Sequence, residues 1–226
     1  MSSKTTRSPI FFVMLMDREE SERLQKKDRE LRKLINLQAL TVKPLHADFD
    51  RAAQEWNLDR TSQFWGRTSI RCLCATIDAT LFTFRKMAEQ LAVVSNIQFD
   101  PKEAEILAEK RLVKENGVER TRPKFLPLQD SVKESFRLFG KAIGVPVKIQ
   151  FDDGYDSLCA TFDLRNRLMH PKNVFDVEVR ESDLQVADKA IHWFNKTYLD
   201  VIHQCQAELS VRVERQIAEL GQRGKA

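Results

Sequence analysis

The chain has 226 residues, enough for one sizeable hydrophobic core with appendages. Hydrophobic residues make up 42% and charged residues 31%, as in ordinary globular proteins, and the net charge of +4 is mild. Only 7 glycines and 7 prolines interrupt long runs of Leu, Glu, Lys, Arg and Gln. This composition favours helices over strands, so we expect a single, mostly helical domain of the all-α class.

The longest apolar run, Ile10 to Met16, is too short to cross a bilayer. Lys4 and Arg7 precede it as in a signal peptide, but the acidic stretch at 17–20 occupies the place of a small-residue cleavage site. We therefore expect this segment to pack onto the body. The four cysteines lack the paired spacing of a zinc site. The sequence thus predicts a cytoplasmic protein with reduced thiols, no metal or other cofactor, and no membrane contact.

The first sixty residues are expected to form a helical arm and lead-in. Residues 16–40 are strongly helix-forming but carry only a sparse line of apolar side chains, which is typical of a solvated or partner-facing helix. Pro44 is expected to break this helix, and a short amphipathic piece should follow around Asp48 to Trp56. We assign residues 1–60 to the arm and 61–226 to the main domain.

The strongest early helix is predicted over 61–94, where apolar residues recur every three or four positions. Asp78 lies at the edge of this apolar stripe, on the same flank as three arginines at 67, 71 and 85. An edge carboxylate paired with a nearby arginine is the simpler interpretation of Asp78, and a role in a functional site is the alternative.

A helix is predicted from Asp100-Pro101 to about Lys114, followed by a basic loop at about 110–125. The basic residues of this insertion cluster around Asn116-Gly117 and are Lys110, Arg111, Lys114, Arg120, Arg122 and Lys124. Such a loop could lie along a polyanion, whereas a solvated surface loop is the alternative.

The second half of the domain should contain three more helices. One spans about 128–143 and is closed by Gly144, and residues 145–151 form the only stretch that looks extended. The turn at Asp152-Asp153-Gly154 then starts a helix that ends at Pro171. After a polar connection, Ser182 is a plausible cap for a last helix whose apolar spacing continues to Ile217.

The segment 163–171 places a guanidinium, an amide and an imidazole within one and a half helical turns. Helical geometry puts Arg165 on the apolar arc near Leu158, Phe162 and Leu168, and points Arg167 to the opposite, solvated side. Because a guanidinium never loses its proton, Arg165 needs an anion, carbonyl groups or a substrate phosphate.

His170 follows Asn166 by four residues, on the same flank and immediately before the proline that ends the helix. An imidazole at a broken helix end is accessible and suits general acid or base catalysis near neutral pH. The alternative is an Asn–His–Asp hydrogen-bonded helix terminus that uses Asp163. Spacing alone leaves both open.

The stretch Arg165-Asn166-Arg167-Leu168-Met169-His170-Pro171 resembles the R-x4-6-H motif, in its RNxxxH form, of the HEPN superfamily. The apolar helix before it and the long helix after it are also similar to that family, and residues 75–82 resemble its second helix, where an acidic residue often recurs. The resemblance covers about 61–209 and implies a HEPN-like helical bundle, to which the arm and the basic insertion are added.

Many HEPN proteins are metal-independent endoribonucleases that act as dimers in toxin–antitoxin or antiviral defence systems. The resemblance implies that His170 handles protons, Arg165 holds the scissile phosphate and Asn166 orients the pair, with Asp78 and Asp163 in support. Some relatives carry a modifiable tyrosine two residues after the histidine; here Lys172 stands there and would add positive potential. RNA, a second copy and an antitoxin or other regulator are the expected partners. A non-catalytic HEPN-like module that binds nucleotide, RNA or protein is the alternative, and a helical scaffold is the third.

Overall fold

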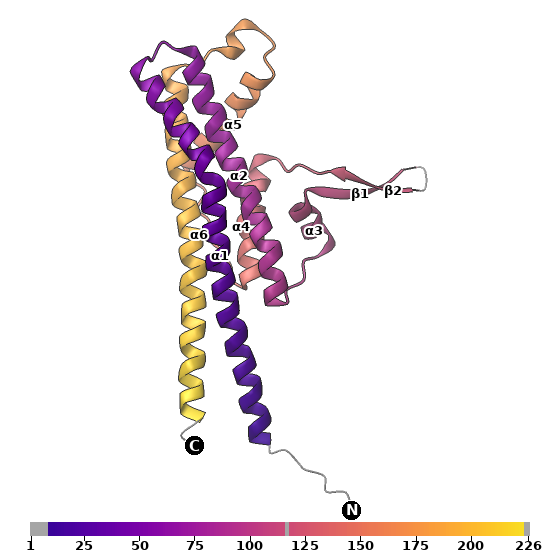
Figure 1. The fold of residues 1–226 in the computed structure, drawn as a ribbon. Coiled ribbons are helices and arrows are strands. Elements are labelled where there is room, and N and C mark those ends of the chain that lie inside the picture. Colours follow the sequence, from indigo (N-terminus) through magenta and orange to yellow (C-terminus); the bar gives the residue numbers. More distant parts are fainter. Residues whose placement is uncertain (1–8, 116–117, 224–226) are drawn as a thin grey trace, which may run out of the picture.

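The computed structural model describes residues 9–115 and 118–223 and is predominantly helical (Figure 1). Five long helices form the body: α1 (Pro9–Leu58), α2 (Gln63–Ser95), α4 (Leu128–Ile143), α5 (Asp153–Met169) and α6 (Glu181–Arg223). Three smaller elements and one short turn of helix complete it: α3 (Pro101–Ala108), the strands β1 (Lys110–Glu115) and β2 (Val118–Pro123), and the 3-10 helix η1 (Val174–Val177). The expected mostly helical class is confirmed.

Helix α2 is the centre of the core and lies close to its predicted bounds. It packs against α1, α4, α5 and α6, and its inward face, including Ile77, Leu81 and Phe84, is completely buried. The Phe84 ring meets Phe136 and Phe139 of α4 edge to face, with centroids 5.0 and 4.7 Å apart. This packing holds the backbone of α2 in place against the helices around it.

The predicted break at Pro44 is wrong, because α1 runs without interruption through that residue. Pro44 lies on the exposed side, whereas Val42, Ala52 and Trp56 of the same helix are buried. Burial of that face offsets the one hydrogen bond that proline removes on the solvent side. The N-terminal part of α1 projects beyond the body beside the C-terminal part of α6, which runs antiparallel to it (Figure 1). The side chains of residues 9–21 lie outside the described part, so the expected packing of the Ile10 to Met16 run stays a prediction.

The predicted helix to Lys114 and the predicted basic loop are also wrong. Helix α3 ends at Ala108, where Glu109 takes a left-handed conformation with φ 52°. Strands β1 and β2 then pair antiparallel as a hairpin that projects from the body (Figure 1). An Asn-Gly pair is a strong sequence signal for such a hairpin. Asn116 and Gly117 themselves lie outside the described residues.

The remaining boundaries follow local signals closely. Helix α4 ends at Gly144, whose φ is 81°, and the Asp152 carboxylate accepts the Gly154 N–H at 3.0 Å where α5 begins. Ser182 is not the cap of α6, because Asp183 accepts the Arg180 N–H at 2.9 Å instead.

Residues 145–152 form no strand. The backbone of Lys148 is instead paired on both sides by the Gln204 side chain, at 2.9 and 3.0 Å, so this segment finds its hydrogen bonds on α6.

The start of α5 is held tightly against α6. A β-carbon at Gly154 would lie 2.7 Å from the Trp193 Cβ, closer than such atoms approach, so only glycine permits this contact. The Trp193 indole N–H donates to the Gln150 carbonyl at 3.2 Å. Among the described residues, none of the helices combines the length and apolar character needed to cross a bilayer.

Candidate functional site

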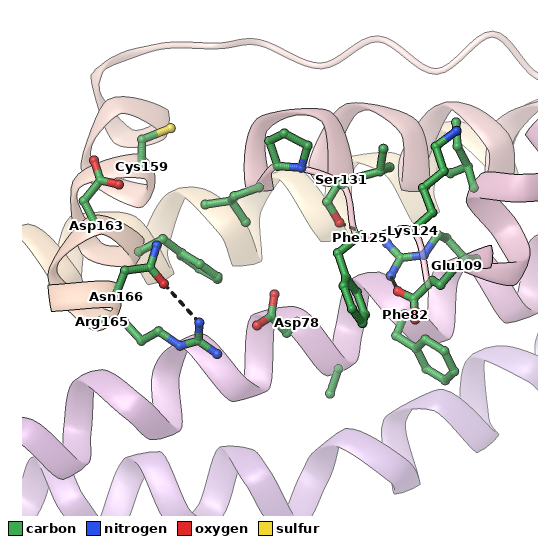
Figure 2. A pocket seen from close by; sticks show the side chains of 17 residues that line it. Asp78, Phe82, Glu109, Lys124, Phe125, Ser131, Cys159, Asp163, Arg165 and Asn166 are labelled. Carbon is green, nitrogen blue, oxygen red and sulfur yellow. Dashed lines mark hydrogen bonds and ion pairs between the residues drawn. The ribbon is translucent and has the colours of Figure 1, made fainter. Parts of the chain in front are cut away.

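The motif residues occupy the last two turns of α5. The buried face of this helix carries Leu158, Phe162, Leu164 and Leu168, and Arg165 is half-buried at the edge of that face. Its guanidinium Nη1 donates to the Asn166 Oδ1 at 3.1 Å (Figure 2). Within the described part of the chain, Arg165 has no ion pair. The guanidinium therefore retains donors for a further anionic or carbonyl partner.

A pocket of about 890 Å³ opens between α2, α5 and the segment that joins β2 to α4. Five of the predicted site residues lie in its wall: Asp78, Lys124, Asp163, Arg165 and Asn166. Three aromatic side chains that the sequence did not assign to the site also line it, namely Phe162 and the exposed Phe82 and Phe125 (Figure 2). The volume is within the range of typical small-ligand sites.

Asp78 points into this pocket from α2 (Figure 2). Its carboxylate makes no hydrogen bond or ion pair with any described residue. Its partial removal from water raises its pKa, and the nearby charges of Arg165 and Arg85 oppose this rise without cancelling it. The simpler interpretation from the sequence, an Asp78 carboxylate paired with a nearby arginine, is therefore wrong.

The three arginines expected beside Asp78 bind elsewhere. Arg67 donates to the Val177 carbonyl at 3.2 Å and Arg71 to the Leu168 carbonyl at 3.3 Å. Arg85 is buried, where it pairs with Glu109 and donates to the Ser131 and Ser135 hydroxyls at 3.0 and 2.7 Å.

Glu109 thus joins the base of the hairpin to the core, and Lys124 adds a second link through Glu105 at 2.8 Å. These contacts assign Arg85 to the support of the pocket wall, and they make the Lys124 ammonium a structural group as well as a pocket-lining one.

His170 lies at the C-terminal cap of α5, outside the pocket lining. Its backbone N–H donates to the Asn166 carbonyl at 3.0 Å, and its side chain is exposed. The imidazole has no hydrogen bond to any described residue. The Asn–His–Asp helix terminus is therefore not formed, since Asn166 binds Arg165 instead and Asp163 binds neither.

The connection after the motif is more ordered than its polar sequence suggested. Asp176 accepts the backbone N–H groups of Lys172 and Asn173 at 2.7 and 3.1 Å, and the Lys172 bond is the main cause of its lowered pKa. Arg167 donates to the Phe175 carbonyl at 3.2 Å and lies 3.8 Å from Asp183. The prediction of a merely solvated Arg167 is wrong: this arginine fastens η1 to α5 and α6.

Exposed apolar side chains lie close to His170 in the sequence. Met169, Val174 and Phe175 are 48%, 73% and 70% exposed. Two further exposed residues, Leu58 and Phe64, belong to the α1–α2 turn at the same end of the molecule (Figure 1). Exposed apolar side chains gathered at one end of a molecule are a candidate surface for a protein–protein contact.

The hairpin carries the predicted basic residues. Arg111 pairs across the two strands with Arg122, and Val113 pairs with Arg120, so three arginines share one face. Lys110, Arg111, Arg120 and Arg122 are exposed, and Lys172 is exposed beyond the motif. The Lys114 side chain lies outside the described residues. This face of the hairpin therefore concentrates positive charge, which suits an anionic partner.

Across the described residues, no group of three or more His, Cys, Asp or Glu side chains is placed to hold a metal ion. Comparisons with known proteins add no relative: no family model, no curated protein and no solved structure matches this chain significantly. The interpretation of the site therefore rests on its own residues and their arrangement.

Proposed function

We propose that this protein is a HEPN-like, metal-independent endoribonuclease that works as a homodimer. One observation carries the proposal. The half-buried Arg165 has an amide as its only hydrogen-bond partner among the described residues, and it precedes by five residues a solvent-exposed His170 whose imidazole makes no hydrogen bond to a described residue. Arg165 can thus bind a phosphate while His170 exchanges protons with it or its ribose.

The chemistry requires no external cofactor. One imidazole removes the proton of a ribose 2′-hydroxyl, the 2′-oxygen forms a bond to phosphorus, and the bond from phosphorus to the 5′-oxygen breaks. A protonated imidazole supplies the proton of that leaving oxygen, which yields a cyclic phosphate and a 5′-hydroxyl end. Arg165 stabilises the charge that develops on the phosphate, and Asn166 holds the guanidinium through its 3.1 Å bond.

Two features support a dimer. General base and general acid act in one reaction, and each chain offers a single histidine in its motif, so two copies would supply both groups. The exposed apolar side chains of Met169, Val174 and Phe175 flank that histidine and would be buried by a symmetric contact. The arginine face of the hairpin would then bind the RNA backbone.

The biological setting we propose is that of a toxin or phage-defence effector in the cytoplasm, restrained by an antitoxin or another regulatory protein. Lys172 occupies the position of the tyrosine that some HEPN proteins use for nucleotidylation. Restraint would thus proceed by another route, such as direct binding over the exposed motif.

The purified protein should cut single-stranded RNA in the presence of EDTA and leave 2′,3′-cyclic phosphate ends, measured by gel electrophoresis and mass spectrometry. His170→Ala should lower the cleavage rate at least 100-fold because one proton transfer is lost. His192→Ala is the matched control, since His192 is an exposed histidine on α6. Equal cleavage by wild type and His170→Ala would contradict the proposal.

The exclusion of His170 from the pocket lining favours one alternative, a non-catalytic module that binds a nucleotide or RNA. The same experiment separates the two functions. A binding module would retain RNA in a filter-binding assay and produce no cyclic phosphate ends.

A further inference from the structure

The geometry points to a guanine-binding subsite beside Arg165, in which Asp78 accepts the base edge and Phe125 stacks on its ring. The inference rests on the proposed function for its setting, because it names the nucleotide that flanks the scissile phosphate. It also makes a claim about binding that holds whether or not cleavage occurs.

The first step is a carboxylate without a protein partner. Asp78 lies in the wall of a pocket of about 890 Å³ without a hydrogen bond or ion pair to any described residue. Arg85 and Lys124 of the same lining are bound to Glu109 and Glu105, whereas Arg165 has no ion pair among the described residues. The exposed Asp78 carboxylate therefore keeps its hydrogen-bond accepting capacity for a ligand that displaces water from the pocket.

The second step is the aromatic surface. Phe125 is 78% exposed and Phe82 is 41% exposed, although both side chains line the pocket. Phe82 follows Asp78 by one helical turn on α2, so the carboxylate and the ring share a face of this helix. The Lys86 ammonium lies 5.6 Å from the centroid of the Phe82 ring. Exposed rings beside a carboxylate that no protein group binds suit a flat ligand with an apolar face and a polar edge.

The third step identifies the base. An ionised carboxylate only accepts hydrogen bonds, so it is best matched by two adjacent donors. The Watson–Crick edge of guanine offers such a pair, N1–H and the N2 amino group. Adenine and cytosine present one amino donor beside an acceptor, and uracil presents a single N–H donor between two acceptors. Arg165 at the same pocket completes the match, because it provides a cation for the attached phosphate.

The test measures binding of the four ribonucleoside monophosphates, in both the 3′ and the 5′ series, to the intact protein by calorimetry. We expect the guanosine nucleotides to bind about 10-fold more tightly than the other three. Asp78→Asn replaces one acceptor oxygen by a donor and should remove this preference. Phe125→Ala should weaken all four nucleotides by about 10-fold, because stacking does not depend on the base.

Asp200→Asn, an exposed aspartate on α6, is the matched control and should bind like the wild type. Equal affinity for the four nucleotides, no binding of any, or an unaltered preference in Asp78→Asn would each overturn the inference. Mapping of cut sites separates it from the proposed function. Guanosine binding without cleavage would support the guanine subsite and refute the proposed nuclease function. Cleavage at sites without a guanosine would refute the guanine subsite alone.

Discussion

Two arginines on neighbouring helices illustrate how the surroundings of one side chain decide its use. Arg85 is buried and pairs with a glutamate and two serine hydroxyls, so removal of its charge would leave those groups unsatisfied. Arg165 is half-buried and has one amide partner among the described residues. The first arginine supports the fold, and the second retains donors for a ligand.

Glu103 is another charged residue that stabilises the fold, at the start of α3. It is 5% exposed in the first turn of α3, where it receives bonds from Lys141 at 2.5 Å and from Arg137 at 2.9 Å. Burial alone would raise its pKa, but the Lys141 bond, the Asp100 backbone bond and the Arg137 bond together lower the value to about 2. The ionised form thus stabilises the fold.

We predict that Glu103→Gln lowers the free energy of unfolding by about 2 kcal/mol at pH 7. Because the folded pKa lies below the ordinary value of 4.5, this contribution is complete above about pH 4.5 and is lost as the pH falls towards 2. Urea denaturation of wild type and variant at pH 7 and pH 3 should show the difference shrinking at the lower pH. Glu134→Gln is the control, since Glu134 pairs among the described residues with the half-exposed Arg137 alone and should cost less. An equal loss at both pH values would show that the charge is not the cause.

At the scale of elements, the boundaries set by local chemistry were predictable. Asp100-Pro101, Asp152 and Gly144 mark helix ends where capping and left-handed geometry act within a few residues. Pro44 was misjudged because burial of the opposite face of α1, a tertiary effect, outweighs the local cost. The hairpin was missed because basic residues concealed its strand pattern.

In the candidate site, too, the features that depend on local spacing were predictable and those that depend on tertiary packing were not. Arg165, Asn166 and His170 share one helix, so periodicity could relate them to one another, although it could not show that His170 lies outside the pocket. Phe125 reaches the pocket only because the hairpin returns the chain to α2. That return depends on long-range packing, which no local pattern encodes.

The hairpin supports a prediction of its own. Replacement of both Arg111 and Arg122 by alanine should raise the KM for RNA about 10-fold at low salt and leave kcat unchanged, because these side chains would contact backbone phosphates far from the scissile bond. The slope of log affinity against log salt concentration should fall by about 2. Lys43→Ala with Lys196→Ala removes the same charge from exposed positions on α1 and α6 and is the control. An unchanged salt slope in the hairpin variant would exclude the hairpin from the RNA interface.

At the scale of the whole molecule, we expect the end that carries His170 to form the contact between two copies. Val174→Ser with Phe175→Ser should convert a dimer to a monomer in light scattering after gel filtration, and cleavage should fall with it. The fold should survive, because Arg167 binds the backbone carbonyl of residue 175 and not its ring. Leu199→Ser removes a comparably exposed side chain, 49% exposed, from α6 and should stay dimeric. Cleavage by a monomeric wild-type protein would refute the two-copy site.

The contact between Gly154 and Trp193 has a mechanical consequence. It lies at the first turn of α5, whereas the motif lies at the last, and the helix between them is continuous. We expect a side chain at position 154 to displace the first turn of α5 from Trp193 and, because the helix is continuous, to tilt its C-terminal end. Arg165, Asn166 and His170 would move as one piece and keep their mutual spacing, while their alignment with Asp78 on the neighbouring helix would change. On this expectation, the missing side chain at Gly154 helps to position a motif at the other end of α5.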